Sequence, residues 1–210
     1  MRKTLRFVFI LLFIEIFSSS IYAKQISAQR QAFIDCSISL LGTPYLWSGK
    51  SPDPGIDCSG LVAFAARKAI KVSYTGSSRA MYKNCIKITD EQREPGDLLF
   101  FSSSNSIDSI SHVAIYLGRY SGEGEYKNKR IFIHSVSDGT KTGVIITSLD
   151  DTNYWTNHYV ASGRFLPSSE YANKIIQEKG YEDGMKALQS SEKLFEIDTW
   201  WKDVDPKWFE

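Results

Sequence analysis

The stretch GIDCSGLVAFAARK, residues 55–68, places a cysteine at the predicted start of a helix. After Cys58, apolar residues recur at Leu61, Val62, Ala65 and Ala69, and this spacing is typical of an amphipathic helix. Asp57 stands just before the cysteine, and aspartate commonly caps helix N-termini. The positive end of a helix lowers the pKa of a thiol, so Cys58 is predicted to be a reactive nucleophile.

The elements around this helix predict an α+β fold. Another amphipathic helix is predicted over Ser27 to Leu41, and a short one over Gly76 to Met81. The pattern then changes to short apolar runs between turns, which is typical of strands. Five strands are predicted, at 98–101, 112–117, 130–136, 143–147 and 159–166. Helices followed by such a run of strands indicate helices packed on an antiparallel sheet.

The chain has only three histidines, and two of them lie on predicted strands, His112 and His134. Alternate residues of a strand share a face, so both imidazoles point to one place if these strands are neighbours. Together with Cys58 they predict a nucleophile, a general base and a second ring that orients the base. His158 lies in a turn rich in Trp and Asn, and we predict it at the surface.

The other two cysteines, Cys36 and Cys85, are interpreted as small buried hydrophobic residues. A disulfide between them is the alternative interpretation. An odd number of cysteines leaves at least one free thiol or an intermolecular bridge in an exported protein.

The first 23 residues read as a secretory signal peptide. A basic segment, Met1 to Arg6, precedes a short apolar run, Phe7 to Phe17, and small residues end at Ala23. The run is shorter than the about 20 apolar residues of a spanning helix. We therefore expect an exported protein, periplasmic or extracellular, with no stable membrane span after cleavage. The formal net charge of +1 gives no bulk electrostatic case for nucleic acid as a partner.

The domain limits follow from shifts in composition. Residues 24–168 are predicted to form the catalytic domain, and residues 169–210 a helical, Trp-rich extension. The extension either packs on the domain or docks a protein partner. A polar segment from Ser102 to Ser111 precedes His112 and is either a mobile loop or a plain hairpin connection.

Five sequence blocks, in this order and spacing, resemble the NlpC/P60 family of cell-wall cysteine peptidases. They are GTPYLWSG at 42–49, DCSGLV at 57–62, PGDLLFF at 95–101, HVAIYLG at 112–118 and FIHS at 132–135. Each block is weak alone, whereas five in order are specific. The match runs from about Gln25 to Leu166. Ser48 departs from the pattern, because the family usually has glycine there.

The resemblance implies a papain-like fold with the nucleophile at a helix start packed on the sheet. It implies hydrolysis of peptidoglycan stem peptides or muropeptides, commonly at the bond between D-glutamate and a diamino acid. By position in the motifs, Cys58 is the nucleophile, His112 the general base and His134 the orienting third member. No metal and no cofactor are expected.

The resemblance also implies three substrate-binding residues. Tyr45 matches a family tyrosine placed near the oxyanion or the substrate, although it is also interpretable as a packing aromatic. Asp57 is expected to bind a free amino terminus of the substrate, to cap the helix, or to do both. Ser59 is expected to contact the substrate beside it.

Three rival functions remain open. A related papain-like amidase would cut the sugar–peptide amide, as an N-acetylmuramoyl-L-alanine amidase does, although its third residue is usually Asn, Asp or Glu. A non-catalytic wall-binding domain would not keep Cys58, His112 and His134 together. An acyltransferase would pass the same thioester to an amine.

Overall fold

The computed structural model of the chain describes residues 28–74, 76–138, 141–151 and 153–166, with the short pieces 178–180 and 183. The predicted signal peptide lies outside these residues, as does nearly all of the predicted extension. Among the described residues, no helix has both the length and the apolar character needed to cross a membrane.

The limits of the central helix, α2 (Cys58–Ile70), follow from the residues at its two ends. Asp57 has an extended backbone, and its side chain accepts a hydrogen bond from the N–H of Gly60, which caps the helix. At the other end Lys71 adopts a left-handed conformation with φ 60°, and its N–H returns to the carbonyls of Ala66 and Arg67. The predicted helix agrees with this one to within one residue.

The remaining helices and a two-stranded ribbon lie outside the main sheet. Residues 28–39 form the N-terminal helix, one turn shorter in its described part than the predicted 27–41. The others are β1 (Lys50–Ser51), β2 (Gly55–Ile56), α3 (Ser78–Lys83), the 3-10 turn Ile107–Ser109 and α4 (Asn153–His158). Ser77 caps α3, so this helix starts two residues later than predicted.

Six strands form one antiparallel sheet, in the order β3-β8-β4-β5-β6-β7. They are β3 (Ile86–Ile88), β4 (Leu98–Phe101), β5 (His112–Arg119), β6 (Arg130–Asp138), β7 (Lys141–Ser148) and β8 (Tyr159–Arg164). The prediction of about five strands is one too few, because it lacks the short edge strand β3. The strands that carry His112 and His134, β5 and β6, are neighbours, which is the condition for their imidazoles to point to one place.

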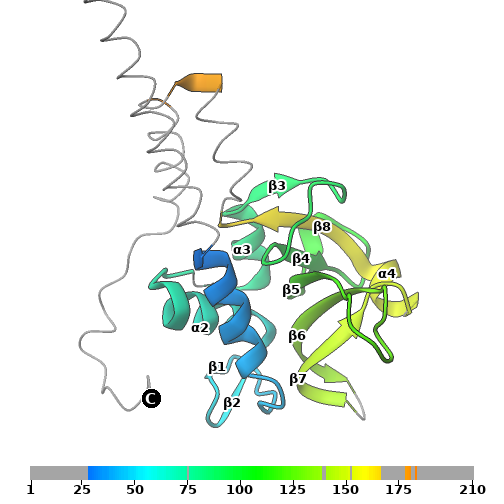
Figure 1. The fold of residues 1–210 in the computed structure, drawn as a ribbon. Coiled ribbons are helices and arrows are strands. Elements are labelled where there is room, and N and C mark those ends of the chain that lie inside the picture. The colour runs from blue at the N-terminus through cyan, green and yellow to red at the C-terminus, as the bar shows by residue number, and fades with distance from the viewer. Residues whose placement is uncertain are drawn as a thin grey trace, which may run out of the picture.

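The sheet is covered on both faces (Figure 1), which explains why all four residues of β4 are buried. The helix of residues 28–39 and α2 lie on one side, and α4 lies on the other. Leu98 and Phe100 belong to the core beneath the helices, whereas Leu99 and Phe101 belong to the core that includes Trp155 of α4. Alternate residues of each strand therefore serve different cores.

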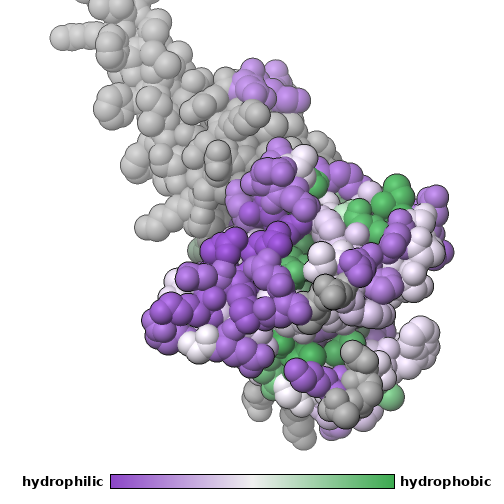
Figure 2. Space-filling view, turned by 90° about the vertical axis from the view of Figure 1, so that its right-hand side faces the viewer, coloured by the Kyte–Doolittle hydropathy of each residue, from purple (hydrophilic) through white to green (hydrophobic). Residues whose placement is uncertain are grey.

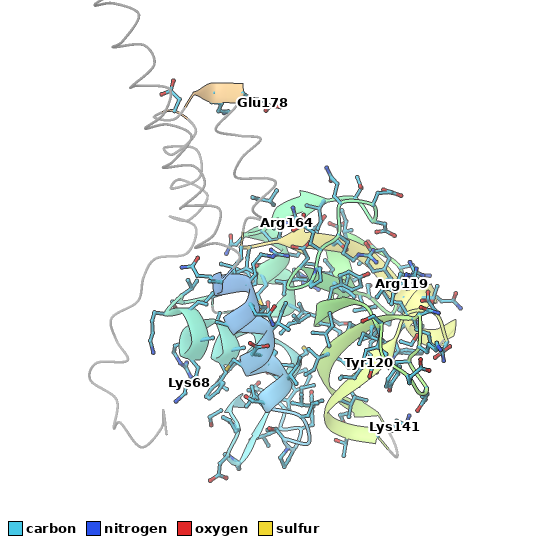
Figure 3. The ribbon with its side chains drawn as sticks, in the orientation of Figure 1. Lys68, Arg119, Tyr120, Lys141, Arg164 and Glu178 are labelled. Carbon is cyan, nitrogen blue, oxygen red and sulfur yellow. The ribbon has the colours of Figure 1, made fainter. Side chains whose placement is uncertain are left out.

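The surface on the side of α4 is mostly polar. Figure 2 shows the side on which α4 lies, where hydrophilic residues cover most of the described surface and hydrophobic residues form small separate patches. Figure 3 labels Arg119, Tyr120 and Lys141 toward this side, and Lys68 on the opposite, helical side. The described part of this face presents no broad apolar area of the kind that marks a stable interface.

Candidate active site

A cleft of about 510 Å³ opens at the N-terminal end of α2, where the helix meets the start of β5. Its wall is made of hydroxyl, aromatic and charged side chains from several separate parts of the chain. They include Tyr45, Trp47, Lys50, Asp57, Cys58, Ser59, Ser102, Ser103, Ser111, His112, Ser135, Tyr154, Trp155 and His158. The predicted nucleophile, the predicted base and the three predicted substrate-binding residues thus face the same space.

Cys58 is the first residue of α2 and is partly buried. The chain ahead of it is held tightly, because the backbone N–H of Asp57 bonds to the carbonyl of Gly49 at 3.1 Å. A side chain at Gly60 would collide with that same carbonyl, its Cβ lying only 2.1 Å away, so only glycine fits there. The hydroxyl of Ser135 on β6 donates to the carbonyl of Ile56 at 2.6 Å. These contacts fix the helix start against the sheet.

The two imidazoles on β5 and β6 form a hydrogen-bonded pair. His112 Nε2 lies 2.9 Å from His134 Nδ1, and His134 Nε2 lies 2.9 Å from Thr147 Oγ1 on β7. His134 is fully buried behind His112 and does not line the cleft. The remaining nitrogen of His112, Nδ1, has no hydrogen-bond partner among the described residues, so it is available to the thiol or the substrate.

Trp155 on α4 holds both imidazoles from one side. Its ring centroid lies 4.7 Å from that of His134 in an edge-on arrangement and 5.0 Å from that of His112. Phe101 also contacts His112, with centroids 5.9 Å apart. The aromatic contacts limit rotation of the imidazoles and keep water away from them.

Burial favours the neutral forms of the thiol and the two imidazoles. Burial lowers the pKa of His112 to about 4, against an opposing effect of Asp57. Burial, and then the neighbouring His112, lower the pKa of His134. Burial raises the pKa of the Cys58 thiol, although backbone hydrogen bonds from Val113 and Ser59 partly offset it. Desolvation of Cys58 therefore outweighs the lowering of the thiol pKa that its place at the helix start predicts.

Tyr45 and Asp57 flank the thiol. Tyr45 forms a bridge to Ile56 beside the helix start, and its phenol interacts electrostatically with both Cys58 and Asp57. Desolvation is the main cause that raises the pKa of this phenol, so it stays protonated and able to donate. Ser59 is buried, and its hydroxyl donates to Asp57 Oδ1 at 2.9 Å.

Comparison with known sequences settles the family. The profile of the NlpC/P60 family matches residues 42–164, more than half of the chain. The chain belongs to the NlpC/P60 family. The resemblance predicted from the five sequence blocks, and the α+β fold that it implies, are thereby confirmed.

Individual proteins agree with this assignment. The NlpC/P60 chain is 34% identical over 128 residues to murein DD-endopeptidase MepH of Escherichia coli (strain K12), covering 60% of this chain and 42% of MepH. It is 32% identical over 123 residues to the bifunctional muramidase/DL-endopeptidase CwlT of Bacillus subtilis (strain 168), covering 59% of this chain and 32% of CwlT. It thus spans less than half of either relative.

A solved structure agrees as well. A protein described as similar to a lipoprotein of the NLP/P60 family, from Staphylococcus aureus subsp. aureus Mu50, has a TM-score of 0.51 and 30% identity. The match covers 65% of this chain and 41% of that one.

Four more residues of this NlpC/P60 domain lie at the site in ways that the sequence did not predict. His158 ends α4 and is partly exposed, as predicted for a surface residue, but it also lines the cleft, which was not predicted. Thr147, Trp155 and Lys50 were missed, because their contacts depend on how the strands and α4 pack.

The cysteine predictions have a clear outcome. Cys36 is partly buried against the core and Cys85 is buried, as the first interpretation predicted, and both are free thiols. The alternative disulfide is absent from the structure. Within the part of the chain that the structure describes, no three His, Cys, Asp or Glu side chains group to hold a metal ion.

Proposed function

We propose that this protein is an exported cysteine peptidase that hydrolyses peptidoglycan stem peptides, at the bond between D-glutamate and the diamino acid. The observation that carries the proposal is the 2.9 Å hydrogen bond between His112 and His134 at the cleft that Cys58 lines. The names of the relatives support peptidoglycan as the substrate, since MepH and CwlT are both called endopeptidases.

The first half of the reaction uses Cys58 as the nucleophile. Its proton passes to His112 Nδ1 while the sulfur attacks the scissile carbonyl carbon, so a C–S bond forms and the carbonyl π electrons move to oxygen. Backbone N–H groups at the start of α2 and the Tyr45 phenol are the available donors for this oxyanion. His112 then protonates the leaving amine, and the C–N bond breaks to give a thioester.

The second half uses water in place of the thiol. His112 removes a proton from water, which attacks the thioester carbonyl, and the collapse of the oxyanion expels the Cys58 sulfur with its proton restored. His134 keeps His112 oriented throughout. Asp57, Ser59 and Tyr45 border the same cleft and are assigned to substrate positioning. The step needs neither a metal nor a cofactor.

Digestion of purified peptidoglycan, with products identified by mass spectrometry, tests the proposal. Cleavage of the D-glutamyl bond gives fragments with a new diamino-acid N-terminus, and Cys58→Ala releases none. Cleavage at the sugar–peptide amide would identify an amidase instead, and cleavage of DD cross-links would give the specificity that the name of MepH states. Transfer to an added amine identifies an acyltransferase, and binding without products a wall-binding domain.

A further inference from the structure

At the mouth of the cleft, Lys50 occupies the Asp57 carboxylate, which a substrate ammonium would need as its partner. Lys50 Nζ lies 3.2 and 3.1 Å from the two carboxylate oxygens of Asp57, and 2.9 Å from the hydroxyl of Ser59. Asp57 precedes the nucleophile and was expected from the sequence to pair with a substrate ammonium. In the structure its ammonium partner belongs to the protein itself.

The carboxylate of Asp57 is already well supplied with donors. Oδ1 accepts from the N–H of Gly60 at 2.5 Å, from the Ser59 hydroxyl at 2.9 Å and from Lys50, while Oδ2 accepts from Lys50. The Asp57 side chain is only 13% exposed. A substrate ammonium would therefore have to displace Lys50, and until then the two positive charges repel each other.

The position of Lys50 is set by the backbone. β1 pairs with β2 so that Lys50 lies opposite Ile56, the residue next to Asp57. The ammonium nevertheless remains accessible, because the Lys50 side chain is 52% exposed and lines the cleft. The three N–H donors of this lysine are taken by the two carboxylate oxygens of Asp57 and the hydroxyl of Ser59. What the ammonium presents to a ligand in the cleft is therefore its positive charge.

The neighbouring surface suits a ligand that extends beyond a short peptide. Trp47 is 81% exposed and Tyr154 is 56% exposed, and both line the cleft. Exposed aromatic rings offer flat apolar surfaces on which the CH faces of a sugar ring can stack.

We propose that Lys50 is a specificity-determining residue that fills the subsite of a substrate ammonium, so that the cleft selects stem peptides whose N-terminal nitrogen is acylated. The nitrogen is acylated when the stem peptide is still attached to its glycan strand. An amide nitrogen carries no charge to be repelled, and the partial negative charge of the acyl carbonyl oxygen is attracted to the Lys50 ammonium. This inference rests on the proposed peptidase function.

The test compares L-Ala-γ-D-Glu-diaminopimelate with its N-acetylated form. We expect the wild type to have the higher kcat/KM on the acetylated peptide. Lys50→Met leaves Asp57 open, so the ratio of kcat/KM values should shift toward the free amine by about tenfold or more, the effect of one charge-assisted hydrogen bond. Lys50→Arg should keep the wild-type preference, because it restores the cation.

Two controls separate specificity from folding. Lys127→Met, in an exposed ion pair with Glu123, should leave the ratio unchanged. Adding Asp57→Asn to Lys50→Met should abolish the gain on the free amine, because the gain acts through that carboxylate. A wild-type preference for the free amine, or an unchanged ratio in Lys50→Met, would overturn the inference.

Binding measurements keep this result apart from the proposed function. If the wild type cleaves neither peptide, the peptidase proposal fails, while calorimetry on Cys58→Ala still tests Lys50. The acetylated peptide should bind more tightly to Cys58→Ala, and the added Lys50→Met should reverse the order. Equal affinities for both peptides would overturn the role of Lys50.

Discussion

His112, His134 and Thr147 form a chain of two hydrogen bonds. Only one arrangement of the hydrogens along this chain lets His112 act as a general base. If Nδ1 of neutral His112 is to accept the thiol proton, Nε2 carries the hydrogen and donates it to His134 Nδ1. His134 then carries its hydrogen on Nε2 and donates to Thr147 Oγ1. The threonine hydroxyl can accept this hydrogen, so Thr147 acts as a positioning residue that supports the required tautomers.

Thr147→Val tests this relay with a side chain of nearly the same shape. We expect kcat to fall about tenfold with KM little changed, because one hydrogen bond to a buried ring is lost. Thr147→Ser should restore the rate. His134→Ala should lower kcat further, and His112→Ala and Cys58→Ala should lower it most, because base and nucleophile act as one unit. An unimpaired valine variant would show that His134 needs no third partner.

The acid limb of the rate profile should reflect the buried position of His112. The base works only while neutral, and burial lowers its pKa to about 4. Activity should therefore persist on acidification below pH about 6.5, the ordinary imidazole value, and be lost as the pH falls toward 4. The profile of kcat/KM against pH measures this, with tryptophan fluorescence to confirm the folded state. A limb near the ordinary value would mean that the ring is hydrated in solution.

The same lowered pKa values make the fold sensitive to acid. The unfolded chain binds protons at His112 and His134 at a higher pH than the folded chain does, so stability falls as the pH drops through about 6.5. For His112 the loss amounts to about 3 kcal/mol when the pH reaches the folded pKa. Urea unfolding at neutral pH and near pH 5 measures the difference, and His112→Gln should lose less than the wild type. Equal losses would place the acid sensitivity elsewhere.

The sequence alone predicts the residues that carry strong chemical signals. Cys58 stands out because an aspartate cap and helical spacing frame it, and His112 and His134 because histidine is rare in this chain. Lys50 and Thr147 carry no such signal, since any strand tolerates a lysine or a threonine. Their contacts arise only after β1 is folded beside Asp57 and β7 beside β6.

At the scale of elements, a buried side-chain hydrogen bond joins the start of the helix that carries Cys58, the proposed nucleophile, to the strand that carries His134. The buried hydroxyl of Ser135 donates to the carbonyl of Ile56, just before the cap of α2. Because this bond links two elements that carry different site residues, its loss should disturb their spacing.

Ser135→Ala should cost about 1–2 kcal/mol of unfolding free energy, because the buried carbonyl of Ile56 loses its donor. We also expect a lower kcat, since small displacements of reacting groups are costly. Urea unfolding and steady-state kinetics measure the two effects. Ser121→Ala, on an exposed turn, should change neither. A destabilised Ser135→Ala variant with full kcat would mean that this bond stabilises the fold but does not position the site residues.

Elements were predictable where local chemistry defines their ends. Asp57, a residue type that often caps helices, marks the start of α2. A four-residue apolar run shortly after the turn Pro95-Gly96 marks β4. β3 was missed because its three residues, Ile86 to Ile88, form a strand only through pairing with β8. Ser48 adopts φ 60°, which explains why the family usually has glycine where this chain departs from it.

At the scale of the whole molecule, one buried carboxylate ties together distant parts of the chain. Asp97 is fully buried and accepts from Arg30 of the N-terminal helix at 3.0 Å. It accepts from Arg164 of β8 at 2.9 and 2.7 Å, and from the backbone N–H of Glu94 at 2.7 Å. Arg164, labelled in Figure 3, lies where β8 passes the helical layer. Asp97 thus fixes the N-terminal helix and the sheet in one arrangement.

Asp97→Asn should destabilise the protein far more than the loss of an exposed ion pair. The amide keeps the shape but removes the negative charge from between two buried guanidinium groups, which Glu94, partly exposed, approaches less closely. Removing one partner of a buried ionic cluster typically costs about 3–5 kcal/mol. Glu123→Gln, which breaks an exposed pair with Lys127, should cost at most about 0.5 kcal/mol. Urea unfolding of the two variants measures the contrast. Equal small losses would mean that packing of the helix, and not the Asp97 charge, holds the layers together.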